Sequence, residues 1–266
     1  MRSILAFMRA SWLSASSYRV SMVLSLVAVI GTVIPVYFIA RALQPLMSNA
    51  IQGEGHQYFA FLLIGSITFL FIPLAVSSLP STITSSITSG TMEAVLGTPT
   101  SLPIMLLGMM GYSFAWTAIR ASVMLIAGAV LGASISWTQL PFAMILLLLI
   151  ILAYVPIGLM AAAAYLAFRT SGPLVPAVMV ISSLLGGVYY PTHVVPSWLE
   201  HVSGAIPLTY GLRALRRVLL EGASLMSVRT DVGILLLMTV VLFAAGGWMF
   251  SAAMRYARRT GSLSYY

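Results

Sequence analysis

Long apolar segments that are almost free of charge dominate this sequence and restrict it to folds that a lipid bilayer can hold. Of its 266 residues, 60% are hydrophobic and only 7% are charged. An α-helix needs about 20 apolar residues to cross the hydrocarbon core of a bilayer. Lipid offers the backbone no hydrogen-bond partners, so a spanning segment must satisfy its own backbone groups. The sequence therefore predicts an all-α integral membrane protein, with residues 1–266 forming a single transmembrane domain.

Six apolar segments are predicted to span the membrane. They cover residues 20–40, 58–79, 104–135, 140–168, 173–190 and 232–256. The third is longer than one crossing needs, so it is either tilted or begins in the interface. Pro73 and Pro156 predict kinks in the second and fourth spans. Gly128 and Gly132 form a small-residue motif that allows close helix packing.

The positive charges indicate how the chain sits in the membrane. Residues 1–19 predict a helix that lies in the interface, because Met8 and Trp12 share an apolar face away from Arg9. Six spans place both termini on one side. If that side is the cytoplasm, it holds Arg2, Arg9, Arg19, Arg169, Arg255, Arg258 and Arg259, and the outside holds Arg41, Arg213, Arg216, Arg217 and Arg229. The cytoplasmic arginines flank the first and last spans, which favours this orientation.

Missing residue types exclude several kinds of chemistry. The chain has no cysteine, so it has no disulfide or thiolate metal site. It also has no lysine, and a phosphate-binding P-loop requires one. Its three histidines lack metal-ligand spacing, so we expect no metal site and no cofactor bound by this chain. If the protein uses ATP, another polypeptide must hydrolyse it.

The polar stretch over residues 191–222 predicts a re-entrant hairpin on the outer side, between the fifth and sixth spans. Its three prolines cut it into pieces too short to cross a bilayer. A short helical turn carries Trp198, and a longer helix over residues 209–221 is followed by Gly222 as a stop signal. Irregular backbone at membrane depth has to be covered by protein or water.

Four arginines are candidate functional groups. Arg213, Arg216 and Arg217 either attract anionic groups or form the polar face of a surface helix, held by Glu221 four residues after Arg217. We favour the polar face. Arg120 lies inside the third span, where an ionisable group either serves function or snorkels to the interface. A carboxylate partner for it would come from a loop, such as Glu200 or Glu221.

Two motifs resemble those of a known family. The run TMEAVLGTP at residues 91–99 is similar to the cytoplasmic segment between spans two and three of type-2 ABC exporter permease subunits. The run PLTYGLRALR at residues 207–216, with Gly222 after it, is similar to their outer hairpin. The order of interfacial helix, six spans and hairpin also matches. The hairpin resembles the drug and lipid branch more than the polysaccharide branch.

This resemblance implies a non-catalytic transport subunit that pairs with a second permease copy, a homodimer in the simplest case. Two cytoplasmic ABC ATPase subunits would bind ATP and Mg, and no nucleic acid is implied. Residues 85–99 would form the coupling segment, with a short helix over Thr91, Met92, Glu93 and Leu96. Glu93 is either a docking carboxylate or a solvated loop charge, and we favour docking.

The remaining candidate residues fall into two groups. Those for translocation or gating are Arg120, Tyr190, Pro207 and Tyr210. Those of the outer hairpin are Trp198, Glu200, Arg213, Arg216, Arg217 and Glu221.

The function that follows is ATP-driven export of a hydrophobic or amphiphilic small molecule or lipid across a bacterial inner membrane. Export of a lipid-linked polysaccharide is the alternative within the same architecture. An ATPase-independent transporter is less favoured, because such proteins place carboxylates at the membrane midplane. A membrane enzyme is disfavoured by the lack of a G-x-S-x-G motif or paired intramembrane aspartates.

Overall fold

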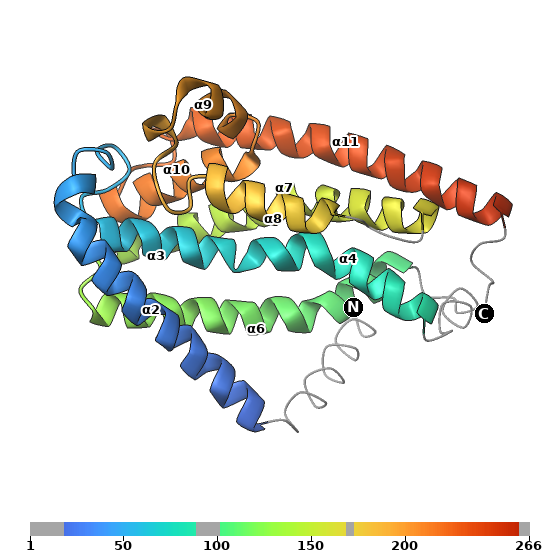
Figure 1. Cartoon of the computed structure of the whole chain (residues 1–266), viewed down its shortest axis with the longest axis horizontal. Helices are drawn as coiled ribbons and strands as arrows, with labels where there is room; N and C mark the ends of the chain where they lie inside the picture. The colour runs from blue at the N-terminus through green and yellow to red at the C-terminus, as the bar shows by residue number, and fades with distance from the viewer. Residues whose placement is uncertain (1–18, 89–101, 169–172, 261–266) are drawn as a thin grey trace.

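The computed structural model describes residues 19–88, 102–168 and 173–260 as helices joined by short loops (Figure 1). No β-strand occurs in these ranges, which confirms the all-α prediction. Five segments of the described chain are long and apolar enough to cross a membrane. They are Val20–Met47, Tyr58–Ser81, Gly111–Val130, Trp137–Phe168 and Arg229–Tyr256. The predicted helix of residues 1–19 lies outside the described residues except for Arg19, and so do the last eleven residues of the predicted coupling segment.

The first described helix is longer than predicted. Helix α2 covers Arg19–Met47 and does not end at Arg41. The Arg41 guanidinium donates a hydrogen bond to the hydroxyl of Tyr37 at 2.9 Å, one helical turn earlier. The loop that follows is shorter than expected as a result. In Figure 1, α2 runs obliquely to the other long helices.

The second span consists of two helices. Helix α3 covers Tyr58–Phe69 and α4 covers Phe71–Thr88. The kink expected at Pro73 appears as a break at Leu70. Proline has no N–H to donate, and its ring clashes with the carbonyl four residues earlier, which belongs to Phe69. The break therefore lies one helical turn before the proline that causes it.

Helix α7 lies at the centre of the molecule. The remaining long helices are α6 (Leu102–Val130), α7 (Leu140–Phe168) and α11 (Arg229–Thr260), and the three-residue helix η1 (Trp137–Gln139) lies between α6 and α7. Helix α7 has the predicted bounds, continues through Pro156, and packs against α4, α10 and α11. Glycines allow the close approach: a Cβ at Gly158 would lie 2.9 Å from the Ala75 carbonyl oxygen, and one at Gly246 would lie 2.7 Å from that of Pro156.

Only one of the two glycines of the small-residue motif, Gly128 and Gly132, supports close helix packing as predicted. A Cβ at Gly128 would collide with Leu63 of α3, so this glycine supports close packing. Gly132 lies beyond the end of α6 with φ of 93°, and nothing lies within 4 Å of its added Cβ. Its role is to turn the chain, because this φ favours glycine.

Helix α8 is shorter than the predicted fifth span. It covers Leu174–Leu185, 12 residues, and Gly186 and Gly187 follow it. Twelve residues extend about 18 Å, which is less than the roughly 30 Å of a hydrocarbon core. The six-span count therefore stays a prediction.

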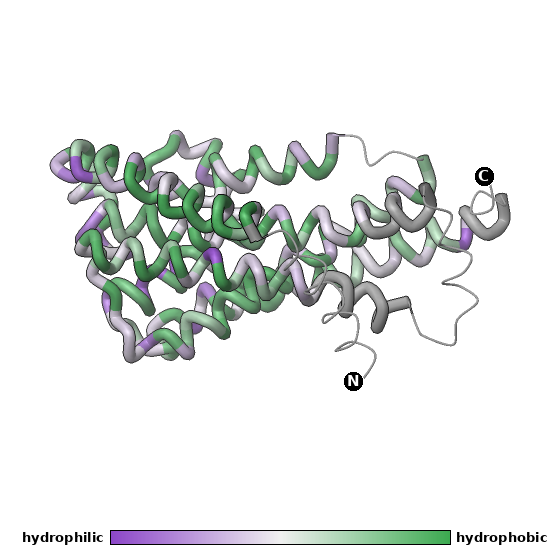
Figure 2. Tube along the Cα trace, turned by 90° about the horizontal axis from the view of Figure 1, so that it is seen from below, coloured by the Kyte–Doolittle hydropathy of each residue, from purple (hydrophilic) through white to green (hydrophobic). Residues whose placement is uncertain are grey.

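The predicted hairpin is present as three short elements. They are η2 (Thr192–Val194), α9 (Ser197–Ser203) and α10 (Pro207–Glu221). Pro207 occupies the first turn of α10, where its missing N–H has no helical partner to lose. Gly222 follows with φ of 67°, the left-handed conformation that ends many helices. We call the end of the molecule that carries α9 and α10 the hairpin end, and Figure 2 shows hydrophilic residues gathered there.

Candidate functional site

Arg216 lies inside the protein although it belongs to a strongly amphipathic helix. Helix α10 turns Leu208, Leu212, Leu215 and Leu219 inward, and Arg216 is four residues after Leu212 on the same side. Its residue exposure is 1%. The prediction that Arg213, Arg216 and Arg217 form one polar outer face is therefore wrong for Arg216.

The Arg216 side chain joins three distant segments to α10. Its Nη1 donates to Glu54 Oε2 at 3.1 Å, Nη2 donates to the Val188 carbonyl at 3.0 Å, and Nε donates to the Phe61 carbonyl at 3.2 Å. The guanidinium carbon lies 3.3 Å from the centroid of the Phe61 ring. The planar guanidinium is thus hydrogen-bonded at every nitrogen and covered by an aromatic face. We call Arg216, Glu54, Phe61 and Val188 the Arg216 cluster.

Two glycines give this cluster its shape. A Cβ at Gly65 of α3 would collide with the Val188 carbonyl and the Arg216 guanidinium. Gly187 has φ of 79°, so the chain turns after α8 and brings Val188 to the cluster. The hydroxyl of Tyr58 donates to the next carbonyl, that of Tyr189, at 2.9 Å. This segment is consequently held by hydrogen bonds at two successive carbonyls.

Burial lowers the pKa of Arg216 to about 10, and the Glu54 carboxylate partly offsets this effect. Arg216 therefore remains a cation at neutral pH. A buried ion costs several kcal/mol unless it is paired and hydrogen-bonded. Glu54 is itself 8% exposed, so the two charges neutralise each other away from solvent. Such an arrangement fixes the position of α10.

A second ion pair ties α10 to the last span. Arg213 Nε donates to Asp231 Oδ1 at 3.0 Å, and a second guanidinium nitrogen contacts the same oxygen. Asp231 lies in the first turn of α11, where the helix dipole favours a negative charge. This hydrogen bond raises the pKa of Arg213, although partial burial acts in the opposite direction. The Arg213 guanidinium also lies 5.4 Å from the centroid of the Tyr210 ring.

A polar cleft of about 600 Å³ opens between α9 and α10. Its lining residues are Thr192, Glu200, His201, Gly204, Thr209, Tyr210 and Arg213. The cleft brings together three predicted residues: Glu200, Tyr210 and Arg213. Trp198, which is 67% exposed, does not line it.

The other hairpin candidates have different surroundings. Arg217 lies 4.0 Å from Glu221, the i,i+4 pair that the sequence predicts. Pro207 is buried at the start of α10, and Tyr190 is half-buried between α8 and η2. The structure therefore distributes the candidate gating residues and does not bring them to one point.

Arg120 is a half-buried cation in the middle of the span Gly111–Val130. Its Nε is buried and has no hydrogen-bond partner within the part of the chain that the structure describes. Neither carboxylate suggested from the sequence forms an ion pair with it, since Glu221 pairs with Arg217 and Glu200 is exposed in α9. Arg120 is thus distinct from the Arg216 cluster.

The candidate coupling residues Thr91, Met92, Glu93 and Leu96 lie outside the described residues. Among residues 19–88, 102–168 and 173–260, no three His, Cys, Asp or Glu side chains are grouped so that they could hold a metal ion. The described site is built from one buried ion pair, two partly exposed ion pairs and apolar packing.

Sequence reasoning missed Glu54 and Asp231. Both are among only five acidic residues in the chain, and each neutralises an arginine of α10. Glu54 stands between Gly53 and Gly55, and such a glycine-flanked position is typical of a solvated turn. The useful signal was the scarcity of carboxylates beside a helix with three arginines.

Comparison with known families adds to this geometry. The family model described as ABC-2 type transporter matches residues 1–220. The chain belongs to the ABC-2 type transporter family. The match contains both Glu54 and Arg216 and ends one residue before the end of α10. A comparison with curated proteins found no match to this chain.

Family membership confirms the resemblance to a type-2 ABC permease. This ABC-2 type transporter is a membrane-spanning transport subunit, and the family works with an ABC ATPase as partner. The match does not separate the drug and lipid branch from other branches.

Proposed function

We propose that this chain is the membrane half of an exporter that moves a hydrophobic or amphiphilic small molecule or lipid out of the cytoplasm or inner leaflet. A separate ATPase supplies ATP hydrolysis with Mg, and a second copy of the chain completes the pathway. Both termini are cytoplasmic in a bacterial inner membrane, and the hairpin end faces outward.

The observation that carries this proposal is the closure of the hairpin end by the Arg216 cluster. A main apolar core fills the helix bundle of a single copy, a smaller apolar cluster joins α4, α7 and α11, and α10 covers the hairpin end. A substrate path therefore runs along the surface of the bundle, between two copies. Helix α2 offers the least covered span, with 11% of its apolar window buried.

The charges of the described spans favour ATP over an ion gradient as the energy source. Their one carboxylate is Asp231, which lies in the first turn of α11 and is paired with Arg213. Secondary transporters commonly need a titratable carboxylate near the midplane. Arg120 instead places a cation inside a span, which suits an amphiphile with an anionic group.

The ATPase contact is proposed for the segment over Thr91, Met92, Glu93 and Leu96. Glu93 is the one acidic residue between Glu54 and Glu200 in the sequence. A carboxylate on a short helix can pair with arginines or lysines of a partner, and this pairing would transmit the motion of the ATPase to the spans.

The test is transport into inside-out vesicles that contain the complex of this chain and its ATPase. The probes are NBD-labelled phosphatidylglycerol and the cationic dye ethidium. We expect ATP-dependent movement of the lipid probe, reduced severalfold by Arg120→Leu, whereas ethidium movement changes little in that variant. If a complex that hydrolyses ATP moves neither probe, the proposed substrate class is wrong.

A further inference from the structure

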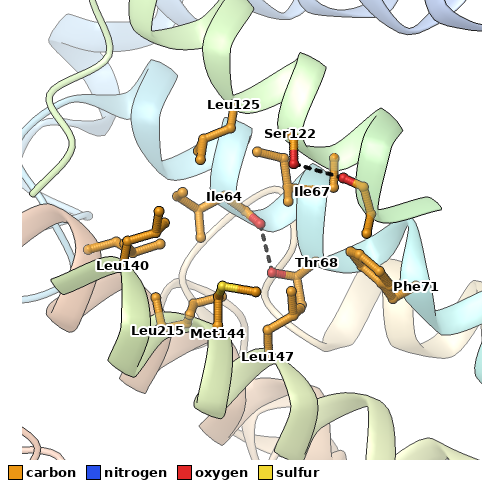
Figure 3. Close-up of a pocket in the computed structure, with 14 residues that line it drawn as sticks. Ile64, Ile67, Thr68, Phe71, Ser122, Leu125, Leu140, Met144, Leu147 and Leu215 are labelled. Carbon is orange, nitrogen blue, oxygen red and sulfur yellow. Dashed lines mark hydrogen bonds between the residues drawn. The ribbon is translucent and has the colours of Figure 1, made fainter. Parts of the chain in front are cut away.

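An apolar groove of about 160 Å³ lies among three spans and α10, and no residue of the Arg216 cluster or of the polar cleft lines it (Figure 3). Helices α3, α4, α6, α7 and α10 all contribute to its wall. The lining residues are Ile64, Ile67, Thr68, Phe71, Ala118, Ala121, Ser122, Leu125, Leu140, Ala143, Met144, Leu147, Leu215 and Leu219. None of them is charged.

The two hydroxyl groups of the wall are already satisfied. Thr68 donates to the Ile64 carbonyl at 2.8 Å, and Ser122 donates to the Ala118 carbonyl at 2.9 Å (Figure 3). An occupant of the groove therefore needs no hydrogen-bonding group. An apolar cavity of about 150 Å³ stays dry and accepts a hydrocarbon such as benzene. Its occupant should be hydrocarbon.

The mouth of the groove opens between α6 and α7. Ala118 and Ser122 on α6 are exposed, and Met144 on α7 is 59% exposed. All three lie in segments long and apolar enough to span the membrane. The medium at this mouth is therefore the acyl-chain region of the bilayer.

The groove is elongated along the spans. Three walls each extend over seven residue-to-residue steps, from Ile64 to Phe71, from Leu125 back to Ala118, and from Leu140 to Leu147. At 1.5 Å per residue this gives a length of about 10 Å. A volume of about 160 Å³ over this length leaves a cross-section much narrower than a protein helix, which is about 10–12 Å wide with its side chains. A flexible acyl chain has the required shape.

We infer that this groove binds one acyl chain of a membrane phospholipid, with the headgroup toward the hairpin end. The headgroup-proximal carbons lie beside Leu140 and Leu219, and the terminal methyl lies near Phe71 and Ala118. The bound chain packs against Leu215 and Leu219, on either side of Arg216 in sequence. The lipid thus supports the helix that carries the Arg216 cluster, and this site is separate from the proposed transport path between copies.

The test uses phospholipids with a photoactivatable diazirine in one acyl chain, placed either near the headgroup or near the terminal methyl. The full chain is reconstituted in nanodiscs of phosphatidylethanolamine and phosphatidylglycerol, irradiated and digested, and the labelled residues are identified by mass spectrometry. We expect the first probe to label around Leu140 and the second around Ala118 and Leu147. Labelling in the groove should exceed that on other exposed apolar surface.

Two blocking variants and one control sharpen the result. Ala118→Phe and Met144→Trp enlarge exposed side chains at the mouth, and we expect each to reduce groove labelling at least fivefold. Ala244→Phe enlarges an exposed alanine of α11 outside the groove and should leave it unchanged. Uniform labelling along the spans, labelling that ignores the diazirine position, or labelling that both blocking variants leave intact would overturn the inference. A mouth covered by a second copy would overturn it too, because the probes would then not reach it.

Discussion

The contacts of Arg216 show how a cation is accommodated in an interior of leucine, isoleucine and phenylalanine side chains. The ion pair alone would not compensate for the loss of water around both charges. Two backbone carbonyls and one aromatic face provide the remaining contacts. If Arg216 is removed, Glu54 and both carbonyls stay buried without this partner.

The first prediction concerns this loss. Arg216→Met should lower the free energy of unfolding by about 3–5 kcal/mol, the usual effect of breaking a buried ion pair. Unfolding in detergent, followed by tryptophan fluorescence, measures it. The control is Arg217→Met, whose partner Glu221 is 4.0 Å away at a partly exposed position, and it should cost no more than about 1 kcal/mol. Equal effects would contradict the special position of Arg216.

The second prediction separates the ion pair from the other contacts of Arg216. Adding Glu54→Gln to Arg216→Met removes the uncompensated carboxylate, so the double variant should be more stable than the sum of the single effects implies. Residues in direct contact commonly show coupling energies of about 0.5–3 kcal/mol. A double-mutant cycle measured by the same unfolding assay checks this. Strict additivity would mean that Glu54 does not neutralise Arg216.

The carboxylates that pair with these arginines are harder to predict from the sequence than the helix that carries the arginines. Arg213, Arg216 and Arg217 are close together in sequence, and their helix is visible from its leucine spacing. Glu54 is 162 positions from Arg216, and helical periodicity says nothing about contacts over such a distance. Asp231 lies just before the predicted last span, residues 232–256, because the apolar run begins after it, yet α11 starts at Arg229.

At the scale of helices, close approach depends on glycines that face a neighbouring backbone. Gly246 of α11 and Gly158 of α7 both lie against carbonyl groups of adjacent helices. Neighbouring glycines in sequence need not share this role. Gly247 has nothing within 4 Å of the position of an added Cβ.

This difference gives the third prediction. Gly246→Ala places a methyl group 2.7 Å from the Pro156 carbonyl and should destabilise the protein by about 1–3 kcal/mol, as overpacking does. Gly247→Ala meets open space and should be neutral or stabilising by up to about 1 kcal/mol, since alanine favours helix more than glycine. Thermal unfolding of the two variants side by side measures the difference. Similar melting temperatures would show that α7 and α11 are not in close contact at Gly246.

The sequence predicts well which segments form helices, but it predicts less well the residues at which these helices begin and end. The apolar run over residues 140–168 is bounded by polar residues and matches α7. Arg41 looked like the end of the first span, but a single arginine can extend along a helix and hydrogen-bond to Tyr37. Pro73 predicted a disturbance correctly, yet the break falls where its ring meets the preceding turn. For α8, the apolar run continues past Gly187, so hydropathy does not show that the helix ends at Leu185. The end is seen only in the structure, where Gly187 has a left-handed conformation.

At the scale of the whole molecule, we propose different tasks for its two ends. The hairpin end is closed by α10, which is tied to α3 through Arg216 and to α11 through Arg213. We propose that the opposite end, where α4 ends and α6 begins, receives the energy of ATP hydrolysis through the segment of sequence between these two helices. The chain contains no lysine and so no P-loop, which makes a partner ATPase essential to this account.

The fourth prediction tests that partnership directly. The chain is captured from native membranes in mild detergent, and the proteins that accompany it are identified by mass spectrometry, for the wild type, Glu93→Arg and the control Glu200→Arg. Glu200 is exposed in α9 at the hairpin end, so reversing its charge should not disturb a contact at the opposite end. We predict an ATPase with a P-loop beside the wild type and the control, and its loss from Glu93→Arg. Recovery of the chain without any ATPase, even after crosslinking, would contradict the view that it is the membrane subunit of an ATP-driven transporter.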